Sequence, residues 1–280
     1  MYKRQGLLYE RDGATWFRTT DFGDDKDRVV VRENGVTTYF ASDIAYHREK
    51  FERGYDVMIN IFGSDHHGYL ARLQAAMSGM GKEPEKLEIM LVQFVVLFRG
   101  KEKVQMTTRG GSYVTLRDLR EEVGNDATRF FYVSRSNDQH LDFDLELATS
   151  QSNENPVYYV QYAHARIASL LRRLEDAGIA SPERAADVFT PLHHDSEVGL
   201  MRAVSRYPEI VNLAAENRAP QTLVHYLREL AAEFHSFYND RRIIDAGHGE
   251  RDARTLLASA TRQVLANGLR LLGVTAPDSM

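Results

Sequence analysis

One short stretch of the sequence gathers side chains that could do chemistry. Residues 60–73, NIFGSDHHGYLARL, place Asp65, His66 and His67 directly after an apolar run and directly before a segment with helical spacing. Three kinds of site fit these residue types: a metal site, a general base, or a cradle for a bound ligand. Adjacent histidines point in different directions, and the neighbourhood offers no cysteine and no His-x-x-x-His pair, which disfavours the metal site.

The choice between a base and a cradle depends on what surrounds these residues. General-base catalysis needs a pKa that burial or a charged partner has tuned, and a sequence does not reveal that. The run at 55–63, YDVMINIFG, has the pattern of a buried strand, a Gly-Ser-Asp turn follows, and YLARLQAAM at 69–77 has helical spacing. Open α/β sheets bind ligands at the carboxyl ends of their strands, so we expect ligand contacts here. We call this expected ligand site, around residues 60–73, the cradle.

The first half of the chain alternates strand-like and helix-like runs. Asn34-Gly35 predicts a hairpin turn, because both residues tolerate a positive φ. Ser42 and Asp43 are placed to cap the next helix and to supply its first-turn acid. The alternation predicts an α/β domain over residues 1–145. Strand patterns occupy residues 14–20, 27–32, 36–40, 56–62 and 89–98, and helical patterns occupy residues 42–54 and 66–81.

The pattern changes near residue 145, after which no strand signal remains. Residues 155–178 place apolar side chains at alternating spacings of three and four, and Gly178 is a natural residue to end that helix. Further amphipathic helices are predicted at residues 196–217, 220–239 and 251–272. Residues 146–280 are therefore predicted to form an all-α helical bundle.

Composition restricts the class of protein. With 280 residues and 43% hydrophobic content the chain can bury a substantial core, and we expect two domains. A formal charge of −5 argues against a polybasic binder but does not exclude RNA. The absence of cysteine rules out disulfides and cysteine metal sites. With no apolar run of about 18 residues and no signal-peptide core at the start, the sequence predicts a cytoplasmic protein without a membrane contact.

The start of the sequence is unusual. MYKRQ precedes GLLYERDGATWFRTTDFG, which has the pattern of a strand pair already in progress rather than of a capped first helix. We expect that the chain begins partway through a longer protein and that residues 1–5 are foreign to it. An ordinary frayed terminus is the alternative.

Several blocks in order give a resemblance to a known family. They are TYFASDIAYH, GSDHHGY, VQMTTRGGSYVTLRDL, NPVYYVQYAHARI, FHSFYNDRRI and ATRQVLANGLRLLGVTAPDSM. Over residues 6–280 the chain resembles the C-terminal half of arginyl-tRNA synthetases, which are class I aminoacyl-tRNA synthetases. The resemblance implies the second half of a Rossmann-like nucleotide-binding catalytic domain, followed by a helical anticodon-binding domain. It also implies an arginine–tRNA ligase that uses ATP, L-arginine and the tRNA for arginine, and we favour a monomer.

By this resemblance, the cradle binds two substrates. Tyr39, Asp43 and His66 would contact arginine, since a guanidinium needs a carboxylate and polar or aromatic neighbours that hold its plane. The spacing alone fits a different interpretation, in which Asp43 only caps its helix and Tyr39 packs in the sheet. Gly63, Asp65 and His66, together with Met106, would contact ATP; Mg²⁺ is expected to come with ATP, and no protein metal site is evident.

The loop at 104–111, VQMTTRGG, departs from the class signature. Class I synthetases carry two lysines here, which take up negative charge on the departing pyrophosphate. Gln105 and Thr108 stand in their places, so the resemblance implies Gln105, Thr107 and Arg109 as catalytic contacts, with the backbone of residues 110–111. Lys101 and Lys103 are candidate substitutes, and a merely solvated basic loop is the alternative.

In the C-terminal bundle, the resemblance implies contacts to unstacked anticodon bases, which proteins read by stacking and by edge contacts. The side chains implied as tRNA contacts are Tyr159, Arg166, Tyr238 and Met280. Tyr158, Tyr162 and Phe237 are predicted to pack in the core. Arg241 and Arg242 are candidates for contacts to the tRNA backbone, with a solvated helix end as the alternative.

Two other functions stay open from the sequence. The His-Ile-Gly-His signature of class I enzymes is absent from these 280 residues, so a non-catalytic tRNA-binding fragment is one alternative. An unrelated nucleotide-binding α/β enzyme is the other, and it would require that the helix around Ala163 and His164 not bind tRNA.

Overall fold

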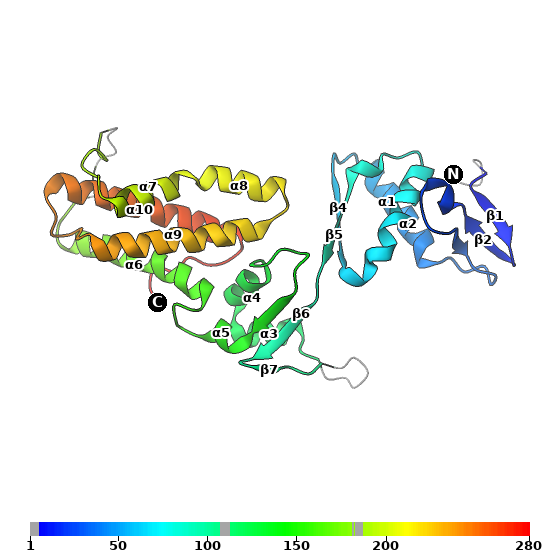
Figure 1. The fold of residues 1–280 in the computed structure, drawn as a ribbon, viewed down its shortest axis with the longest axis horizontal. Helices are drawn as coiled ribbons and strands as arrows, with labels where there is room; N and C mark the ends of the chain where they lie inside the picture. Colours follow the sequence, from blue (N-terminus) through cyan, green and yellow to red (C-terminus); the bar gives the residue numbers. More distant parts are fainter. Residues whose placement is uncertain (1–5, 107–112, 181, 183–186) are drawn as a thin grey trace. The chain divides into compact units, whose positions relative to one another are not determined.

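The computed structural model describes residues 6–106, 113–180, 182 and 187–280 (Figure 1). The chain divides into two compact units, and each is described by itself. The first unit comprises residues 1–94 and 137–139, and the second comprises residues 95–136 and 140–280. The functional division near residue 145 stays a prediction.

The first unit opens with a small antiparallel sheet in the order β1-β2-β3. A tight turn joins β1 to β2, with Asp12 and Gly13 both at positive φ, as two-residue hairpin turns require. The strands of this sheet are β1 (Leu8–Arg11), β2 (Ala14–Phe17) and β3 (Arg28–Val31).

A βαβ unit follows and positions the cradle. Strands β4 (Met58–Gly63) and β5 (Leu87–Val92) pair in parallel from Met58↔Leu87 to Gly63↔Val92. Between them lie the 3₁₀ helix η3 (Ser64–Tyr69) and the helix α2 (Leu70–Gly79). The strand and the helix predicted on either side of the GSDHHGY block are therefore confirmed, and the block itself is the 3₁₀ turn that joins them.

The first unit has a core of its own. Phe17, Phe40, Met58 and Met77 are among its buried side chains. Gly79 lets α2 approach the sheet closely, because a Cβ on it would lie 2.7 Å from the Phe17 ring. This packing holds α2, and with it the end of the 3₁₀ turn, against β2.

The predicted strand at 36–40 is wrong. Thr37 makes only an isolated bridge to Val31, and helix α1 (Tyr39–Glu52) begins directly afterwards. Its N-cap is Thr38, whose hydroxyl accepts from the backbone N–H of Ala41, so the predicted capping by Ser42 and Asp43 is also wrong. The reason is that a threonine hydroxyl caps a helix as Ser or Asp does, and this one comes a turn earlier. The Asn34-Gly35 turn does form.

The predicted strand at 89–98 is two strands. β5 ends at Val92, and β6 (Val95–Arg99) belongs to another sheet in the second unit. There β6 pairs with β7 (Glu102–Lys103) and, in parallel, with β8 (Leu141–Asp144). Three short helices accompany this sheet: α3 (Leu116–Val123), α4 (Asn125–Tyr132) and α5 (Leu145–Thr149).

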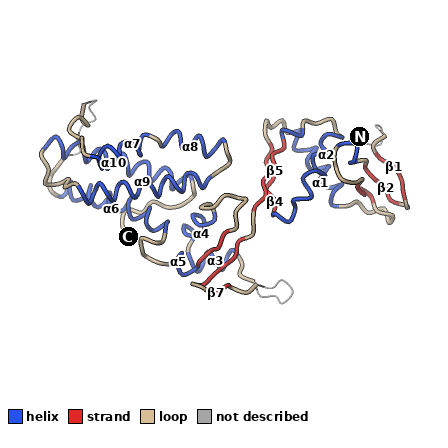
Figure 2. The backbone as a smooth tube through the Cα atoms, in the orientation of Figure 1, coloured by secondary structure: helices blue, strands red, loops and turns tan. Residues whose placement is uncertain are grey.

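Helices alone follow among the described residues after β8 (Figure 2). The bundle consists of α6 (Pro156–Asp176), α7 (Asp195–Ser205), α8 (Tyr207–Glu216), α9 (Pro220–Asp240) and α10 (His248–Leu271). The predicted helices match these, except that the run at 196–217 breaks at Arg206, two residues before Pro208. Gly178, at φ 71°, follows α6 as predicted.

The helices α6, α9 and α10 lie side by side (Figure 1). Gly268 permits the close approach of α10 to α9, since a Cβ there would lie 2.5 Å from a Leu227 methyl carbon. Arg254 of α10 donates to Glu197 of α7 at 2.7 Å, and both side chains are almost fully buried. Removing one partner of such a buried pair would leave an uncompensated charge, so the pair fixes how these helices dock.

Candidate functional site

The carboxylate of Asp43, on α1, contacts the end of the 3₁₀ turn that follows β4. Asp43 is half-buried in α1, and the hydroxyl of Tyr69 donates to its Oδ2. Burial, followed by the hydrogen bond to Asp43, raises the pKa of Tyr69 well above its ordinary value, so this hydroxyl remains a donor. The guanidinium of Arg72 lies 4.7 Å from the Tyr69 ring centroid. A fixed carboxylate with aromatic neighbours can bind a cation.

Tyr39 stands one helical turn before Asp43, on the same face of α1. Its side chain is 87% exposed and therefore available to a ligand. The interpretation that Tyr39 packs in a sheet is wrong, because the residue begins a helix and faces solvent.

The rest of the cradle is the 3₁₀ turn after β4. The His66 ring stacks on Phe62, with centroids 5.7 Å apart, and meets Tyr69 edge-on at 6.3 Å. Asp65 folds back over Gly63, where an added Cβ would lie 2.6 Å from Oδ1 of Asp65. Only a residue without a Cβ at position 63 therefore leaves room for the Asp65 carboxylate. Asp65 and His66 keep more than half of their side chains exposed, so both can reach a ligand.

The loop residues belong to the other unit. Gln105 and Met106 are exposed after β7, and Thr107 and Arg109 lie outside the described residues, as do Thr108 and residues 110–111. Lys103 is the last residue of β7, while Lys101 precedes that strand, and both are exposed.

No group of three His, Cys, Asp or Glu side chains that could hold a metal ion occurs in the part of the chain that the structure describes. Within the same residues, no helix is long and apolar enough to cross a membrane.

Three of the four predicted tRNA contacts lie together on the face formed by α6 and α9. The Arg166 guanidinium stacks 4.2 Å from the Tyr238 ring centroid and donates to Asn239 Oδ1 at 3.0 Å. His235 of α9 packs against α6, with its ring centroid 4.8 Å from that of Tyr159. We call this set of side chains the aromatic face: Tyr158, Tyr159, Tyr162, Arg166, His235, Tyr238 and Asn239.

The prediction that Tyr158, Tyr162 and Phe237 pack in the core holds only in part. Phe237 is fully buried, whereas Tyr162 is 38% exposed. Tyr158 and Tyr162 stack in nearly parallel planes 6.0 Å apart, and Tyr162 also stacks on His235. The reason is that residues four apart on α6 share one face, and α9 places a histidine rather than an aliphatic side chain against it. The sequence reasoning missed His235 and Asn239.

Met280 lies at the end of a tail that packs on α6 and α10. The buried His164 donates from its Nδ1 to the backbone carbonyl oxygen of Pro277 at 2.8 Å. Arg172 and Arg262 both bind Asp278. None of these contacts joins the exposed Met280 to the aromatic face.

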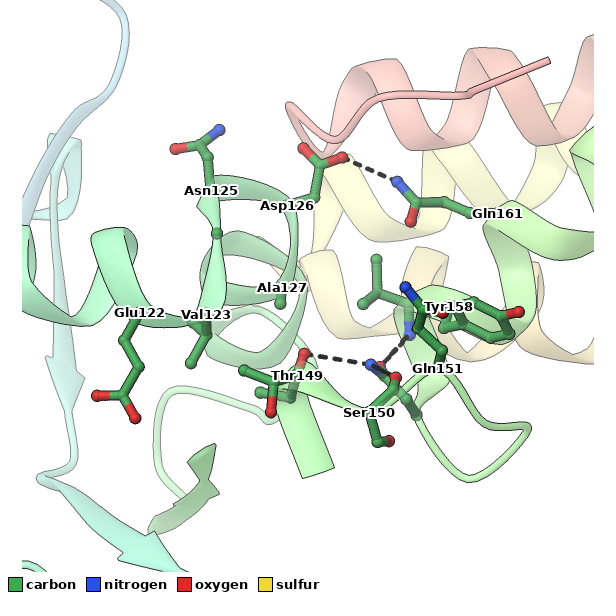
Figure 3. Close-up of a pocket in the computed structure, with 14 residues that line it drawn as sticks. Glu122, Val123, Asn125, Asp126, Ala127, Thr149, Ser150, Gln151, Tyr158 and Gln161 are labelled. Carbon is green, nitrogen blue, oxygen red and sulfur yellow. Dashed lines mark hydrogen bonds between the residues drawn. The ribbon is translucent and has the colours of Figure 1, made fainter. Parts of the chain in front are cut away.

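A cavity of about 580 Å³ lies beside the aromatic face (Figure 3). Its wall comes from the end of α3, the start of α4, the end of α5 and the start of α6, and it shares Tyr158 with the aromatic face. Asp126 accepts from Gln161 at 2.8 Å and from the Thr275 hydroxyl, which ties α4, α6 and the C-terminal tail together. No sequence pattern pointed to this cavity.

The protonation of His235 predicts a pH dependence of stability. Burial, followed by the positive charge of Arg166, lowers the pKa of His235 to about 4. The unfolded chain takes up this proton as the pH falls through about 6.5, whereas the folded chain does not, so folding is weakened between pH 6.5 and pH 4. We expect a loss of about 2 kcal/mol over this range, because partial exposure reduces the full effect of about 1.4 kcal/mol per pKa unit.

Urea unfolding at pH 7 and pH 4.5 measures this effect. His235→Phe keeps a ring in place and should reduce the difference between the two free energies of unfolding. His225→Phe, which changes an exposed histidine of the same helix, is the matched control and should not. An equal pH dependence in all three proteins would show that His235 titrates normally.

Comparison with known proteins agrees with this architecture. Residues 1–167 match the family described as "tRNA synthetases class I (R), catalytic domain", and residues 160–280 match the "DALR anticodon binding domain". The arginine–tRNA ligase of Syntrophotalea carbinolica is 55% identical over 280 residues, which are 100% of this chain and 50% of that protein. That of Coxiella burnetii is 55% identical over 278 residues, which are 99% of this chain and 47% of that protein.

Solved structures show the same likeness. A structure described as a putative arginyl-tRNA synthetase from Campylobacter jejuni has a TM-score of 0.90 and 35% identity, and the match covers 100% of this chain and 60% of that one. Thermus thermophilus arginyl-tRNA synthetase has a TM-score of 0.79 at 24% identity, with 100% and 57% covered, and shows the shared fold. The chain spans about half the length of the curated relatives it matches. By its catalytic-domain match and its DALR domain, this chain belongs to the arginyl-tRNA synthetase family of class I synthetases.

Proposed function

We propose that this chain provides one part of an arginine–tRNA ligase, which activates arginine with ATP and transfers it to the tRNA for arginine. The observation that carries the proposal is the Asp43 carboxylate, held by Tyr69 at the end of the 3₁₀ turn that follows the carboxyl end of a parallel strand. An open α/β sheet binds its ligand at that position. The family membership and the names of the relatives support the same reaction.

Arginine would bind with its guanidinium against Asp43. Tyr69 occupies one oxygen of the carboxylate and fixes its plane, and the remaining lone pairs accept from the substrate. Tyr39, one turn away and exposed, would cover the planar cation with its ring. His66 stacks on Phe62 beside this position and would line the boundary between arginine and ATP.

ATP would bind at the 3₁₀ turn of the first unit, where Gly63 and Asp65 would receive the ribose and Asp65 would accept from its hydroxyls. Met106, in the second unit, stays a predicted ATP contact. Mg²⁺ would enter with the ATP phosphates as part of the substrate. Gln105, Thr107 and Arg109, or Lys101 and Lys103 in their place, would stabilise the charge on the departing pyrophosphate.

The exposed face of the β4–β5 sheet supports a catalytic domain that further polypeptide completes. Ile61 is 67% exposed on this face, with Ile59 at 41% and Val92 at 40%. Parallel sheets are normally covered on both faces, because their strands are apolar on both. The occupant that fits is the rest of the synthetase catalytic domain, since the chain spans about half the length of its relatives.

The bundle would bind the anticodon loop of the tRNA. Tyr159 and Tyr238 offer ring faces to unstacked bases, and Arg166 keeps donors for base edges or phosphate. Met280 would contribute from the C-terminal tail. Arg241 and Arg242, just after α9, would contact the tRNA backbone. The reaction would take place in the cytoplasm, and a monomer stays a prediction.

We expect the 280-residue chain to bind the tRNA for arginine more tightly than a tRNA with an altered anticodon. Tyr238→Ala should weaken the binding by about 1–3 kcal/mol, because a stacked base loses its platform. Tyr55→Ala, an exposed tyrosine of the first unit, is the control. The measurement is a filter-binding titration at fixed salt, and equal affinities for the two tRNAs would withdraw the anticodon assignment.

A non-catalytic tRNA-binding role is the second candidate. The observation in its favour is the aromatic face, whose side chains all lie on α6 and α9 of the second unit. It predicts the same tRNA binding and no activation of arginine even when the rest of a synthetase is supplied.

A further inference from the structure

A chain of three hydrogen bonds runs beneath the cradle, inside the first unit. Lys50 Nζ donates to Oδ1 of Asn60 at 2.6 Å, and Nδ2 of Asn60 lies 2.5 Å from Nε2 of His47. Nδ1 of His47 lies 2.7 Å from the backbone carbonyl oxygen of Asp43. His47 and Asn60 are 3% and 6% exposed, so water does not compete for these bonds.

The chemistry of the end groups fixes the direction of every bond. An ammonium has only donors, so Asn60 must present its oxygen to Lys50 and its NH₂ to His47. Nε2 of His47 is then an acceptor, and the ring proton sits on Nδ1, where it is donated to the carbonyl of Asp43. Burial lowers the pKa of His47, which agrees with a neutral ring.

The polar groups around this ring come from three elements. Lys50 and Asp43 lie on α1 with His47, and Tyr69 of the 3₁₀ turn binds the Asp43 carboxylate. Asn60 is the neutral partner on β4. The Lys50 ammonium lies 4.8 Å from the Tyr46 ring centroid, which stabilises the charge at this partly buried position. Lys50, the first donor in the series of hydrogen bonds, is therefore held in place.

We propose that Lys50, Asn60 and His47 are positioning residues that hold the backbone of Asp43 and thereby set where its carboxylate meets the substrate. The proposal rests on the arginine-binding role proposed above for Asp43. Tyr69 fixes the Asp43 side chain from one side, while the chain of hydrogen bonds ties the Asp43 carbonyl to β4 from beneath. These hydrogen bonds therefore fix the position of α1, which carries Asp43, relative to β4.

The state of the His47 ring can be measured in the 280-residue chain without any activity. Long-range proton–nitrogen NMR correlations of the histidine rings should show His47 as the neutral Nδ1–H tautomer from pH 8 to pH 5. Asn60→Asp replaces the donor by a second acceptor of the same shape, so His47 should become doubly protonated at neutral pH. Asn34→Asp, in the exposed turn, is the matched control and should leave the ring unchanged. An Nε2–H tautomer in the unaltered chain would overturn the proposed direction.

The effect on substrate binding is measured in the chain combined with the remaining half of the catalytic domain. Asn60→Asp and Lys50→Met should raise the KM for arginine about tenfold or more, with the KM for ATP changed less than about threefold. His47→Asn keeps a donor near the Asp43 carbonyl and should recover part of what His47→Phe loses. An unchanged KM for arginine in a variant whose His47 tautomer has changed would overturn the positioning role. If the combined unaltered protein forms no adenylate, the proposed function fails, while the NMR result still decides the tautomer.

Discussion

Asp43→Ala, in the chain combined with the rest of the catalytic domain, should raise the KM for arginine by about 30-fold or more and leave the KM for ATP nearly unchanged. The guanidinium would lose its carboxylate in a partly desolvated site, which costs about 2–5 kcal/mol. The hydroxyl of Tyr69 would also lose its acceptor. Steady-state kinetics of arginine-dependent exchange between ATP and pyrophosphate measures both constants.

Two further variants separate charge from structure. Asp43→Asn keeps the shape and an acceptor for Tyr69 but removes the charge, so it should lose most of the affinity for arginine. Ser42→Ala, the exposed neighbour on the same helix turn, should behave as the unaltered protein. A KM for arginine that is unchanged in Asp43→Ala would remove Asp43 from the substrate site.

The sequence pattern predicts the elements around the cradle well where periodicity is strong. The strand before the GSDHHGY block and the helix after it were both found, because a buried parallel strand and an amphipathic helix have distinct apolar spacings. The start of α1 was missed, because Tyr39 and Phe40 continue a β-like run and only the Thr38 cap marks the boundary. The break at Val92 was missed because two apolar strands in different sheets look like one run.

The sequence indicates side chains of the cradle that are close together along the chain, but not the contacts between residues far apart in sequence. Tyr69 binds Asp43 from 26 positions away, and no periodicity in the sequence encodes that contact. A weak signal for the buried network does exist: Asn60 interrupts the apolar run MINIF, and His47 stands four residues after Asp43. A polar residue inside a buried strand needs a partner, so this asparagine could have indicated the network.

The aromatic face shows the same limit. Spacing along α6 placed Tyr159 and Arg166 on one side of the helix, as observed. Whether Tyr162 faces the core or solvent depends on its neighbour across the helix pair, His235, which lies 73 residues later. The spacing of apolar residues within α6 alone does not reveal which side chain of another helix packs against it.

The second large effect concerns the 280-residue chain by itself, which we expect to catalyse no arginine-dependent exchange between ATP and pyrophosphate. The class I reaction needs preorganised contacts on both sides of the transferring phosphate, each worth about 10² to 10³ in rate. The chain lacks the His-Ile-Gly-His signature and exposes one face of its parallel sheet. Losing one whole side of the site should therefore reduce exchange below detection, even with tRNA present.

The most direct test of the account measures this exchange in three samples: the chain alone, the remaining half of the catalytic domain alone, and the two together, joined in one polypeptide or mixed. We predict no exchange in the first two samples and arginine-dependent exchange in the third, which Asp43→Ala abolishes at low arginine concentration. Exchange by the 280-residue chain alone would contradict the division of the active site, and no exchange in the combined sample would leave only the tRNA-binding role.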